Sequence, residues 1–378
     1  MYSRFLYERN PIVQQLKLDE TMQNMREIAA EIAPLDPGRN ALAYMSRAYP
    51  GDYKVLIETY GPDPGKHALG ARAQAIIGYL TGRLHASHRE AAEAMGVLHA
   101  LEVSVGSVAA IQQQVSQALA EPVRAAQRFV EQQKSQHVDE TGWRECGRRT
   151  WLRVNATREV TVFQLPGGRS TKQAQQVISS STKSIVTTDR YEVYNWLEAT
   201  RRQICWAHLA RDFQAMVERG GESARTGQAL LEQSRQLFTL WHRVRDATLR
   251  RAQLQAQIKP IRQQVKELLE VGSRLAPAKT RRTCQNILKV EQALWTFARV
   301  AGVEPTNNAA ERARRRAALW RRKSFGTQSE AGSRFVERIL SVITTLRQQG
   351  RDVLDYLTTL CASSPHDGAS ICLLPDTS

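Results

Sequence analysis

The sequence predicts an α/β fold in which helices cover a mixed β-sheet. Three short runs between Gln136 and Leu165 are rich in β-branched and aromatic residues, and a Gly-containing loop and a short turn separate them. Such runs predict an antiparallel meander. Over residues 171–209, runs with helical and strand character then alternate. Antiparallel strands followed by strands that alternate with helices are typical of a mixed sheet with helices on its faces.

The alternating part contains four elements. We expect a helix at "TKQAQQVIS" (171–179), a short apolar strand at "SIVTTDR" (184–190), a second helix at "YEVYNWLEA" (191–199) and a fifth strand at "QICWAHL" (203–209). This order matches a ribonuclease-H-like sheet, in which the first and fourth strands are neighbours.

Helical segments precede the sheet. Residues 71–133 have a helical pattern throughout, in which Ser87 and Glu90 form a capping box and a third helix opens after Ser104 or Ser107. Three helices with a short second one resemble a helix-turn-helix unit, and a plain helical bundle is the alternative. A further helix is expected at residues 19–33, followed by a Pro- and Gly-rich linker that ends at Gly70.

Helical segments also follow the sheet. Residues 212–300 predict a helical insertion with two antiparallel helices that are broken near Pro260. A helix then opens at "EPTNNAAER" (304–312), and the tail from Ala362 is Ser-, Pro- and Gly-rich, which predicts fraying. The last long helix carries apolar residues at helical spacing, namely Phe335, Ile339, Val342, Ile343 and Leu346.

The net charge and the cysteine content limit the classes of function that the sequence is compatible with. The 378 residues include 53 Lys and Arg against 37 Asp and Glu, a formal net charge of +16. A charge of this size attracts polyanions, nucleic acid above all, because each phosphate contact releases counterions. Charges interrupt every long apolar stretch, so no membrane span is expected, and the first residues lack a secretory pattern. Five widely spaced cysteines argue against a disulfide framework, and a cytoplasmic location is expected.

Three acidic residues stand where a metal site could form. Asp139 lies on the first predicted strand, Asp189 ends the fourth, and Glu311 lies in the first turn of the helix at 304–312. Neighbouring first and fourth strands would place the aspartates side by side, and a crossing helix could add the glutamate. Three such carboxylates repel one another unless divalent cations neutralise them, and oxygen ligands favour Mg²⁺ or Mn²⁺. Two ions about 3.5–4 Å apart can activate the attacking oxygen and stabilise the leaving oxygen of a phosphoryl displacement.

Each acid also has a purely structural alternative. Asp139 could accept turn hydrogen bonds at a strand end, and Asp189 could cap a helix that begins near Tyr191. Glu311 could close a capping box with Asn308. Their joint occurrence on the expected elements of one fold favours a site.

Five long motifs carry a family resemblance. They are "HVDETGWRECGRRTWLRVNAT", "TTDRYEVYNWL", "RRQICWAHLARDFQAMVERGG", "EPTNNAAERA" and "SFGTQSEAGSRFVERILSVITTLRQQGRDVLDYL". In these motifs the chain resembles the catalytic half of the insertion-sequence sixty-six family of DDE transposases, over a region from about Tyr60 to Leu360. The resemblance implies that Asp139, Asp189 and Glu311 are the catalytic triad. Glu140 is then a neighbour only, since successive strand residues face opposite sides.

The resemblance implies a DNA transposase of a bacterial insertion sequence, a polynucleotidyl transferase. Water activated by Mg²⁺ or Mn²⁺ would hydrolyse the element ends, and the freed 3′-hydroxyl would attack target DNA. Asp139 would bridge two ions, while Asp189 and Glu311 would each hold one. Pairing of the ends predicts a homo-oligomer, and small accessory proteins of the same element are implied as partners. The alternatives are a DNA-binding relative without catalysis and a ribonuclease-H-fold nuclease that cuts without joining.

Two further groups of residues bear on DNA binding. Cys205 and His208 form a C-x-x-H spacing that resembles a motif near the second aspartate of several transposase groups. A zinc site needs about four ligands and no second pair is in reach by sequence, so we expect a structural or DNA-positioning role for His208. A basic run follows Glu311 directly, and a solvated charge run is its alternative interpretation. The residues expected to contact DNA are His208, Arg312, Arg315, Arg316, Arg322 and Lys323.

The chain departs from the family pattern in two places. Members commonly carry a cysteine-rich, zinc-binding segment ahead of the helical region, whereas residues 1–60 contain no cysteine. The arginines at 314–316 stand where relatives are expected to have a proline. The expected domains are an N-terminal helix and linker (1–65), a helical, helix-turn-helix-like DNA-binding region (66–133), a catalytic core in two parts (134–218 and 301–361) around a helical insertion (219–300), and a flexible tail (362–378).

Overall fold

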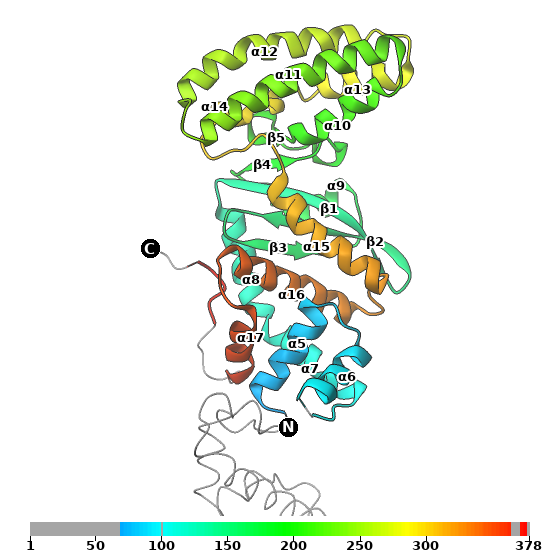
Figure 1. Cartoon of the computed structure of the whole chain (residues 1–378), viewed down its shortest axis with the longest axis vertical. Coiled ribbons are helices and arrows are strands. Elements are labelled where there is room, and N and C mark those ends of the chain that lie inside the picture. The colour runs from blue at the N-terminus through cyan, green and yellow to red at the C-terminus, as the bar shows by residue number, and fades with distance from the viewer. Residues whose placement is uncertain (1–68, 100, 364–370, 376–378) are drawn as a thin grey trace, which may run out of the picture. The chain divides into compact units, whose positions relative to one another are not determined.

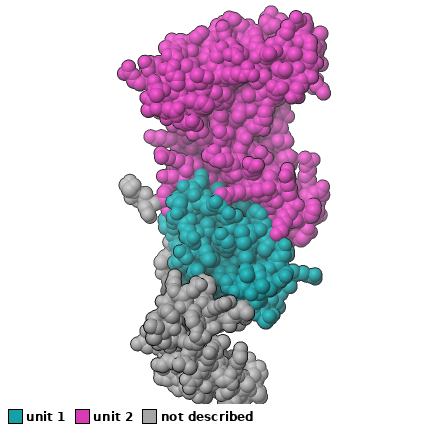
Figure 2. Space-filling model, viewed as in Figure 1, with its two compact units in different colours: residues 1–122, 334–373 teal, residues 123–333, 374–378 magenta. Residues whose placement is uncertain are grey.

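The computed structural model describes residues 69–99, 101–363 and 371–375, which divide into two compact units. The first unit comprises residues 1–122 and 334–373, and the second comprises residues 123–333 and 374–378 (Figure 2). The helix expected at residues 19–33, the linker up to residue 68 and most of the tail lie outside the described residues.

The described part of the first unit is helical. It contains α5 (Ala71–Arg83), α6 (His88–His99), α7 (Val105–Ala118), α17 (Val353–Ala362) and most of α16 (Glu330–Gln348) (Figure 1). Both α7 and α17 pack on α5. The predicted capping box at the start of α6 is confirmed, because the Glu90 N–H donates to Ser87 Oγ at 3.2 Å and the Ser87 N–H donates to Glu90 Oε2.

Of two other expectations for the helical segments, the structure confirms one and corrects the other. The five apolar residues predicted along α16 are all buried, as the helical spacing requires. The long third helix expected before the sheet is divided, because α7 ends at Ala118 and α8 (Ala120–Gln132) begins after Leu119.

The second unit contains the predicted mixed sheet, which confirms the α/β architecture. Its five strands have the order β3-β2-β1-β4-β5. Strands β1, β2 and β3 form the predicted antiparallel meander, and β4 pairs in parallel with β1 and β5 in parallel with β4. The strands are β1 (Ser135–Glu145), β2 (Arg148–Ala156), β3 (Thr161–Gln164), β4 (Ile185–Thr188) and β5 (Arg202–Ile204). A two-residue turn with positive φ at Cys146 and Gly147 joins β1 to β2, as is typical of tight hairpins.

One predicted element near the sheet is wrong in type, and a second is correct in type but shorter than expected. The helix expected at 191–199 is only a 3₁₀ turn, η1 (Glu192–Tyr194), because the buried Arg202 side chain binds the carbonyl oxygen of Tyr191 just before it. The strand expected at 203–209 ends at Ile204, and α10 (Trp206–Val217) follows. Short apolar runs do not distinguish strand from helix. Here the buried residues that follow have helical spacing, namely Trp206, Leu209, Phe213 and Met216.

The segment predicted as a helical insertion (219–300) is helical, but Pro260 does not break it. It comprises α11 (Gly221–Arg245), α12 (Arg251–Gly272), α13 (Ala278–Leu288), η3 (Glu291–Leu294) and α14 (Thr296–Arg299). An interior proline costs about 3 kcal/mol, yet α12 continues through it because a buried apolar stripe holds both halves. The stripe consists of Leu254, Ile258, Ile261, Val265 and Leu269. The break lies at residues 246–250, where Ala247 has a φ of 58°. Within the described residues, no helix combines the length and the apolar composition that crossing a membrane requires.

Helices cover both faces of the sheet. On one face, α9 (Thr171–Val177) and η1 pack over Val138 and Val186 in one apolar cluster. On the other face, α15 (Asn308–Ser324) lies across β1 and β2 (Figure 1). The Arg321 side chain fixes the end of α15 to β1 by donating to the Gly142 carbonyl oxygen at 2.6 Å.

The segment after α15 is bound to the β1–β2 hairpin. The Thr327 N–H donates to the Arg144 carbonyl oxygen at 2.9 Å, and the Cys146 N–H donates to the Thr327 carbonyl oxygen at 2.8 Å. Gly326 makes this approach possible, because its φ is +118° and a Cβ there would overlap the Arg144 carbonyl oxygen. The position of α15 on the sheet therefore depends on a glycine at this point.

We predict that Gly326→Ala lowers the free energy of unfolding by about 3 kcal/mol or more, because a left-handed backbone costs about 1–2 kcal/mol for alanine and the overlap adds to it. Gly147→Ala is the matched control, since Gly147 also has a positive φ but would place its Cβ in open space. Urea denaturation of both variants measures the difference. Equal costs for the two substitutions would contradict the close approach.

Candidate active site

Two acidic side chains meet at the junction of β1 and β4. His137 pairs with Thr187 in the parallel register, so Asp139 is level with Asp189, which directly follows the end of β4. Burial raises the pKa of Asp139 to about 7, Arg314 opposes this, and the charges of Glu140 and Asp189 raise the pKa further. The pKa of Asp189 is also raised, mainly by burial. The sheet therefore holds two carboxyl groups that resist ionisation together.

Asp139 faces α15. Its Oδ2 atom lies 2.6 Å from Arg314 Nε, and this ion pair lacks the geometry of a hydrogen bond. Its Oδ1 atom accepts from the Glu140 N–H at 2.8 Å. The structural alternative of a strand-end residue is wrong for Asp139, because β1 continues to Glu145.

Glu140 has a different set of partners. It lies 2.9 Å from Arg169 and 3.6 Å from the fully buried Arg153, and the Tyr194 hydroxyl donates to it. Tyr194 belongs to η1, so Glu140 is bound on the η1 side while Asp139 contacts α15. Two arginines therefore compensate the charge of Glu140.

The loop that carries Asp189 is fixed by its own hydrogen bonds and by Arg202. The Tyr191 N–H donates to Asp189 Oδ1 at 2.9 Å. The helix-cap alternative for Asp189 is nevertheless wrong, because the N-cap residue of η1 is Tyr191 and no side chain caps this turn. Arg202 on β5 is buried and donates to the carbonyl oxygens of Asp189 at 3.0 Å and Tyr191 at 3.2 Å. Burial lowers the pKa of Arg202 to about 10. Sequence reasoning missed Arg202, whose one signal was a cationic residue at the start of an apolar strand.

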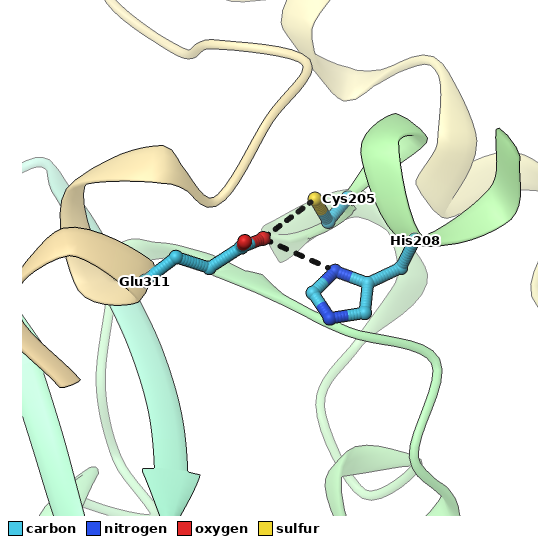
Figure 3. Close-up of side chains that lie close together, drawn as sticks. All are labelled: Cys205, His208 and Glu311. Atoms are coloured by element: carbon cyan, nitrogen blue, oxygen red, sulfur yellow. Dashed lines mark hydrogen bonds and ion pairs between the residues drawn. The ribbon is translucent and has the colours of Figure 1, made fainter. Parts of the chain in front are cut away.

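Glu311 turns toward α10 and away from its own helix start. Its Oε1 atom lies 3.3 Å from His208 Nδ1 and 3.7 Å from Cys205 Sγ (Figure 3). Its Oε2 atom lies 3.3 Å from Arg211 Nη2. The capping-box alternative is wrong, because the N-cap of α15 is Asn307 and no side chain caps this helix.

Asn307 joins three elements of the site. Its buried side chain donates from Nδ2 to the Val138 carbonyl oxygen at 2.7 Å, and its N–H donates to Cys205 Sγ at 3.2 Å. Its carbonyl oxygen accepts from the Glu311 N–H at 3.0 Å. One residue thus binds the start of α15 to β1 beside Asp139 and to the residue before α10.

The structure divides the expected site residues into two sets. Asp139 and Asp189 interact electrostatically with each other, whereas Glu311 contacts Cys205, His208 and Arg211. Within the described part of the chain, Cys205, His208 and Glu311 are the three potential metal ligands whose donor atoms lie within 4.8 Å of one another. Burial lowers the pKa of His208, and the charges of Glu311 and Asp189 oppose this. The His208 side chain therefore interacts electrostatically with both Glu311 and Asp189.

An open hollow of about 620 Å³ runs along α15 beside Glu311. The predicted DNA-contacting residues Arg312, Arg315 and Arg322 line it together with Arg314. Arg316 and Lys323 are not among its lining residues. The hollow places four guanidinium groups next to a potential metal ligand, an arrangement that suits a polyanion.

The family of the chain follows from comparison with known proteins. The family model described as "Transposase IS66 family" matches residues 75–334, which is more than half of the chain. The chain belongs to the IS66 transposase family. The matched residues of this family member include Asp139, Asp189, Glu311 and the arginines of the hollow, and the resemblance stated from the sequence motifs is confirmed.

One curated relative is the uncharacterized protein y4qI of Sinorhizobium fredii. It is 28% identical over 191 residues, which cover 46% of this chain and 34% of that protein. The match thus spans about a third of the relative's length.

We predict that Asn307→Ala lowers the free energy of unfolding by about 2–3 kcal/mol, because it leaves the buried Val138 carbonyl oxygen without its donor. Asn308→Ala is the matched control, since Asn308 is the adjacent residue of the same type and is exposed. Its cost should stay within about 0.5 kcal/mol. Thermal and urea unfolding measure the loss of stability in each variant. Similar losses for the two variants would show that the Asn307 side chain does not hold the start of α15 against β1.

Proposed function

We propose that this protein is a DNA transposase that cuts the ends of its element and joins them to target DNA. In this proposal Asp139, Asp189 and Glu311 hold two Mg²⁺ or Mn²⁺ ions at a ribonuclease-H-like core. The observation that carries it is the pair of buried acids on neighbouring parallel strands, whose pKa values burial raises. The strand order and membership of the transposase family support the same reading.

The donor atoms fit hard divalent cations. All three side chains offer carboxylate oxygens, the ligands that Mg²⁺ and Mn²⁺ prefer. Asp139 Oδ2 is buried and accepts no hydrogen bond among the described residues. A pKa near 7 at Asp139 means that one guanidinium does not offset the cost of burying its charge, and a divalent cation would. Bound ions would supply the Lewis acidity that activates the attacking oxygen and stabilises the leaving one.

The chain's own residues then have separate tasks. Asp139 would bridge the two ions, and Asp189 and Glu311 would each hold one. Arg202 positions Asp189 by binding backbone carbonyl oxygens, which leaves the carboxylate free for other partners. His208 and Arg211 hold the Glu311 carboxylate in place.

The substrate in this proposal is DNA. The arginines of the hollow would bind backbone phosphates beside the acids, and the net charge of +16 would speed the encounter with a polyanion. Helices α5, α6 and α7 would form a DNA-binding region of their own. Joining two element ends in one reaction requires at least two copies of the catalytic core, so a homo-oligomer belongs to the proposal, as do accessory proteins of the same element.

We predict that Asp139→Asn and Asp189→Asn each lower Mg²⁺-dependent cleavage and strand transfer about 100-fold or more. The assay uses labelled DNA that carries the element ends. Asp246→Asn is the matched control, because it removes an exposed aspartate of the helical insertion and should leave both steps unchanged. Strand transfer by Asp139→Asn at the wild-type rate would overturn the ligand assignment, and cleavage without joining by the wild type would identify a nuclease.

The stability of the Asp139→Asn variant shows whether its loss of activity comes from a lost metal ligand or from a failure to fold. A folded-state pKa of about 7 for Asp139 lies above its unfolded value, so its stabilising effect is fully present below pH 4 and is lost as the pH rises toward 7. The neutral Asn side chain avoids this loss. Without divalent ions at pH 8, Asp139→Asn should therefore be at least as stable as the wild type.

We predict that removing three exposed arginines of the hollow lowers the salt dependence of DNA binding. Each lost phosphate contact reduces the slope of log K against log salt by about 0.9, so the triple variant should lose about 2–3. The substituted residues, each changed to Ala, are Arg312, Arg315 and Arg322.

The matched control removes the same charge elsewhere. Both triple variants change the net charge from +16 to +13 (16 − 3). The control variant changes three exposed arginines of the helical insertion to Ala, namely Arg225, Arg274 and Arg282. Equal slopes for the two triple variants, measured by fluorescence anisotropy across a salt series, would contradict the placement of DNA along the hollow.

A further inference from the structure

We propose that Arg169 is a positioning residue that holds the segment after Asp189 against the sheet and thereby orients the Asp189 carboxylate. Arg169 directly precedes Ser170, the N-cap residue of α9, and lies outside the acids and arginines to which the proposed function gives a task. The role of Arg169 rests on the proposed function, because that function assigns Asp189 to a metal ion.

Three segments of the chain meet at the Arg169 guanidinium group. Its Nε atom donates to Glu140 Oε1 at 2.9 Å. Its Cζ atom lies 4.3 Å from the centre of the Trp151 ring and 3.9 Å from the centre of the Tyr191 ring. A guanidinium within about 6 Å of the centre of an aromatic ring is attracted to the face of that ring. One side chain therefore connects β1, β2 and the segment that follows β4.

The backbone on both sides of Arg169 is fixed. The Thr150 hydroxyl on β2 donates to the Gly167 carbonyl oxygen at 2.7 Å. The Ser170 N–H donates to Gln173 Oε1 at 3.2 Å at the start of α9. The Arg169 side chain therefore extends from a fixed point, so its contacts can hold the other segments in one place.

Tyr191 links Arg169 to the acid. The Tyr191 N–H donates to Asp189 Oδ1 at 2.9 Å, and Arg202 donates to the Tyr191 carbonyl oxygen at 3.2 Å. Arg202 thus holds the backbone of Tyr191, while Arg169 holds its ring. A movement of Tyr191 would turn the Asp189 carboxylate, because one of the two carboxylate oxygens accepts from this N–H.

Charge compensation of Glu140 alone does not account for Arg169. Glu140 already lies 3.6 Å from the fully buried Arg153 and accepts from the Tyr194 hydroxyl, so a second guanidinium leaves one positive charge in excess. Burial lowers the pKa of Arg169, but the hydrogen bond and the charge of Glu140 outweigh burial and raise it. The charge of Asp189 adds to this rise. The excess charge therefore also attracts the Asp189 carboxylate.

The test measures the Mg²⁺ requirement of cleavage with labelled DNA that carries the element ends. Arg169→Ala should raise the Mg²⁺ concentration at half-maximal rate about 10–100-fold, the usual effect of losing a residue that supports a metal ligand. The rate at saturating Mg²⁺ should fall less. Arg149→Ala is the matched control, because the exposed Arg149 also lies over the Trp151 ring, at 5.1 Å, and should keep the wild-type requirement. No shift in Arg169→Ala, or equal shifts in both variants, would overturn the proposal.

The Tyr191 ring allows a second test that does not depend on the folding of Arg169→Ala. Tyr191→Leu removes the ring and keeps the N–H that binds Asp189, whereas Tyr191→Phe keeps both. The Mg²⁺ requirement should therefore rise more in Tyr191→Leu than in Tyr191→Phe. Equal shifts in these two variants would contradict a contact that acts through the ring.

Hydrogen exchange tests the contact without activity and without metal. Arg169→Ala should speed the exchange of the backbone amides of residues 190–195, and Arg149→Ala should not. Unchanged exchange in Arg169→Ala would show that this side chain does not hold the segment. Faster exchange with a wild-type Mg²⁺ requirement would overturn the positioning role and leave a structural contact.

Failure of the proposed function gives a different result. A wild-type protein without Mg²⁺-dependent cleavage would refute that function and, with it, the assignment of Asp189 to a metal ion. The exchange measurement would still decide whether Arg169 holds the segment after Asp189. Mg²⁺-dependent cleavage by the wild type with an unshifted requirement in Arg169→Ala would refute the role of Arg169 alone.

Discussion

The parallel pairing of β1 with β4 is the interaction on which the candidate site depends. It brings together two aspartates that are far apart in sequence and holds both carboxyl groups away from water. Such a pair opposes folding unless something positive or protonated compensates it. The surrounding arginines compensate the acidic residues of the site to different degrees. Glu140 has two arginine partners, whereas Arg202 binds carbonyl oxygens of the Asp189 loop and leaves that carboxylate less compensated.

Helix α15 supplies the second constraint, because it contributes to both sets of side chains. Asn307 fixes its start to β1 and to Cys205, and Arg321 fixes its end to β1. Between these ties, Glu311 points toward α10 and Arg314 toward Asp139. Residues three apart on a helix lie on adjoining parts of one face. A rotation of α15 would therefore move the acid and the arginine together.

The features that could be predicted from the sequence are those that depend on residue periodicity and on strand order. Runs of β-branched and aromatic residues between turns identified the meander, and helical spacing identified the buried face of α16. The expected strand order then anticipated the neighbouring aspartates. Pro260 and the 191–199 segment were misjudged, because packing along α12 and the hydrogen bonds of Arg202 override local preference. The meeting of Glu311 with Cys205 and His208 was also out of reach. A long helical insertion separates them in the chain, and a C-x-x-H pair carries no signal about its third partner. Asn308 was considered as the N-cap residue, and Asn307 was overlooked. An asparagine that caps a helix and one whose buried side chain binds another strand cannot be distinguished from sequence alone.

The charge balance at Asp139 supports the proposal that a cation binds there. Arg314 lies 2.6 Å away, yet its side chain is 34% exposed, and water screens part of its attraction. Burial acts on the carboxylate in full and raises the pKa of Asp139 to about 7, so desolvation exceeds the attraction of the guanidinium. The charge of Asp189 adds to the imbalance. An ion with two charges, placed where it contacts both aspartates, would counter desolvation and repulsion at once, which a single arginine approaching from α15 does not.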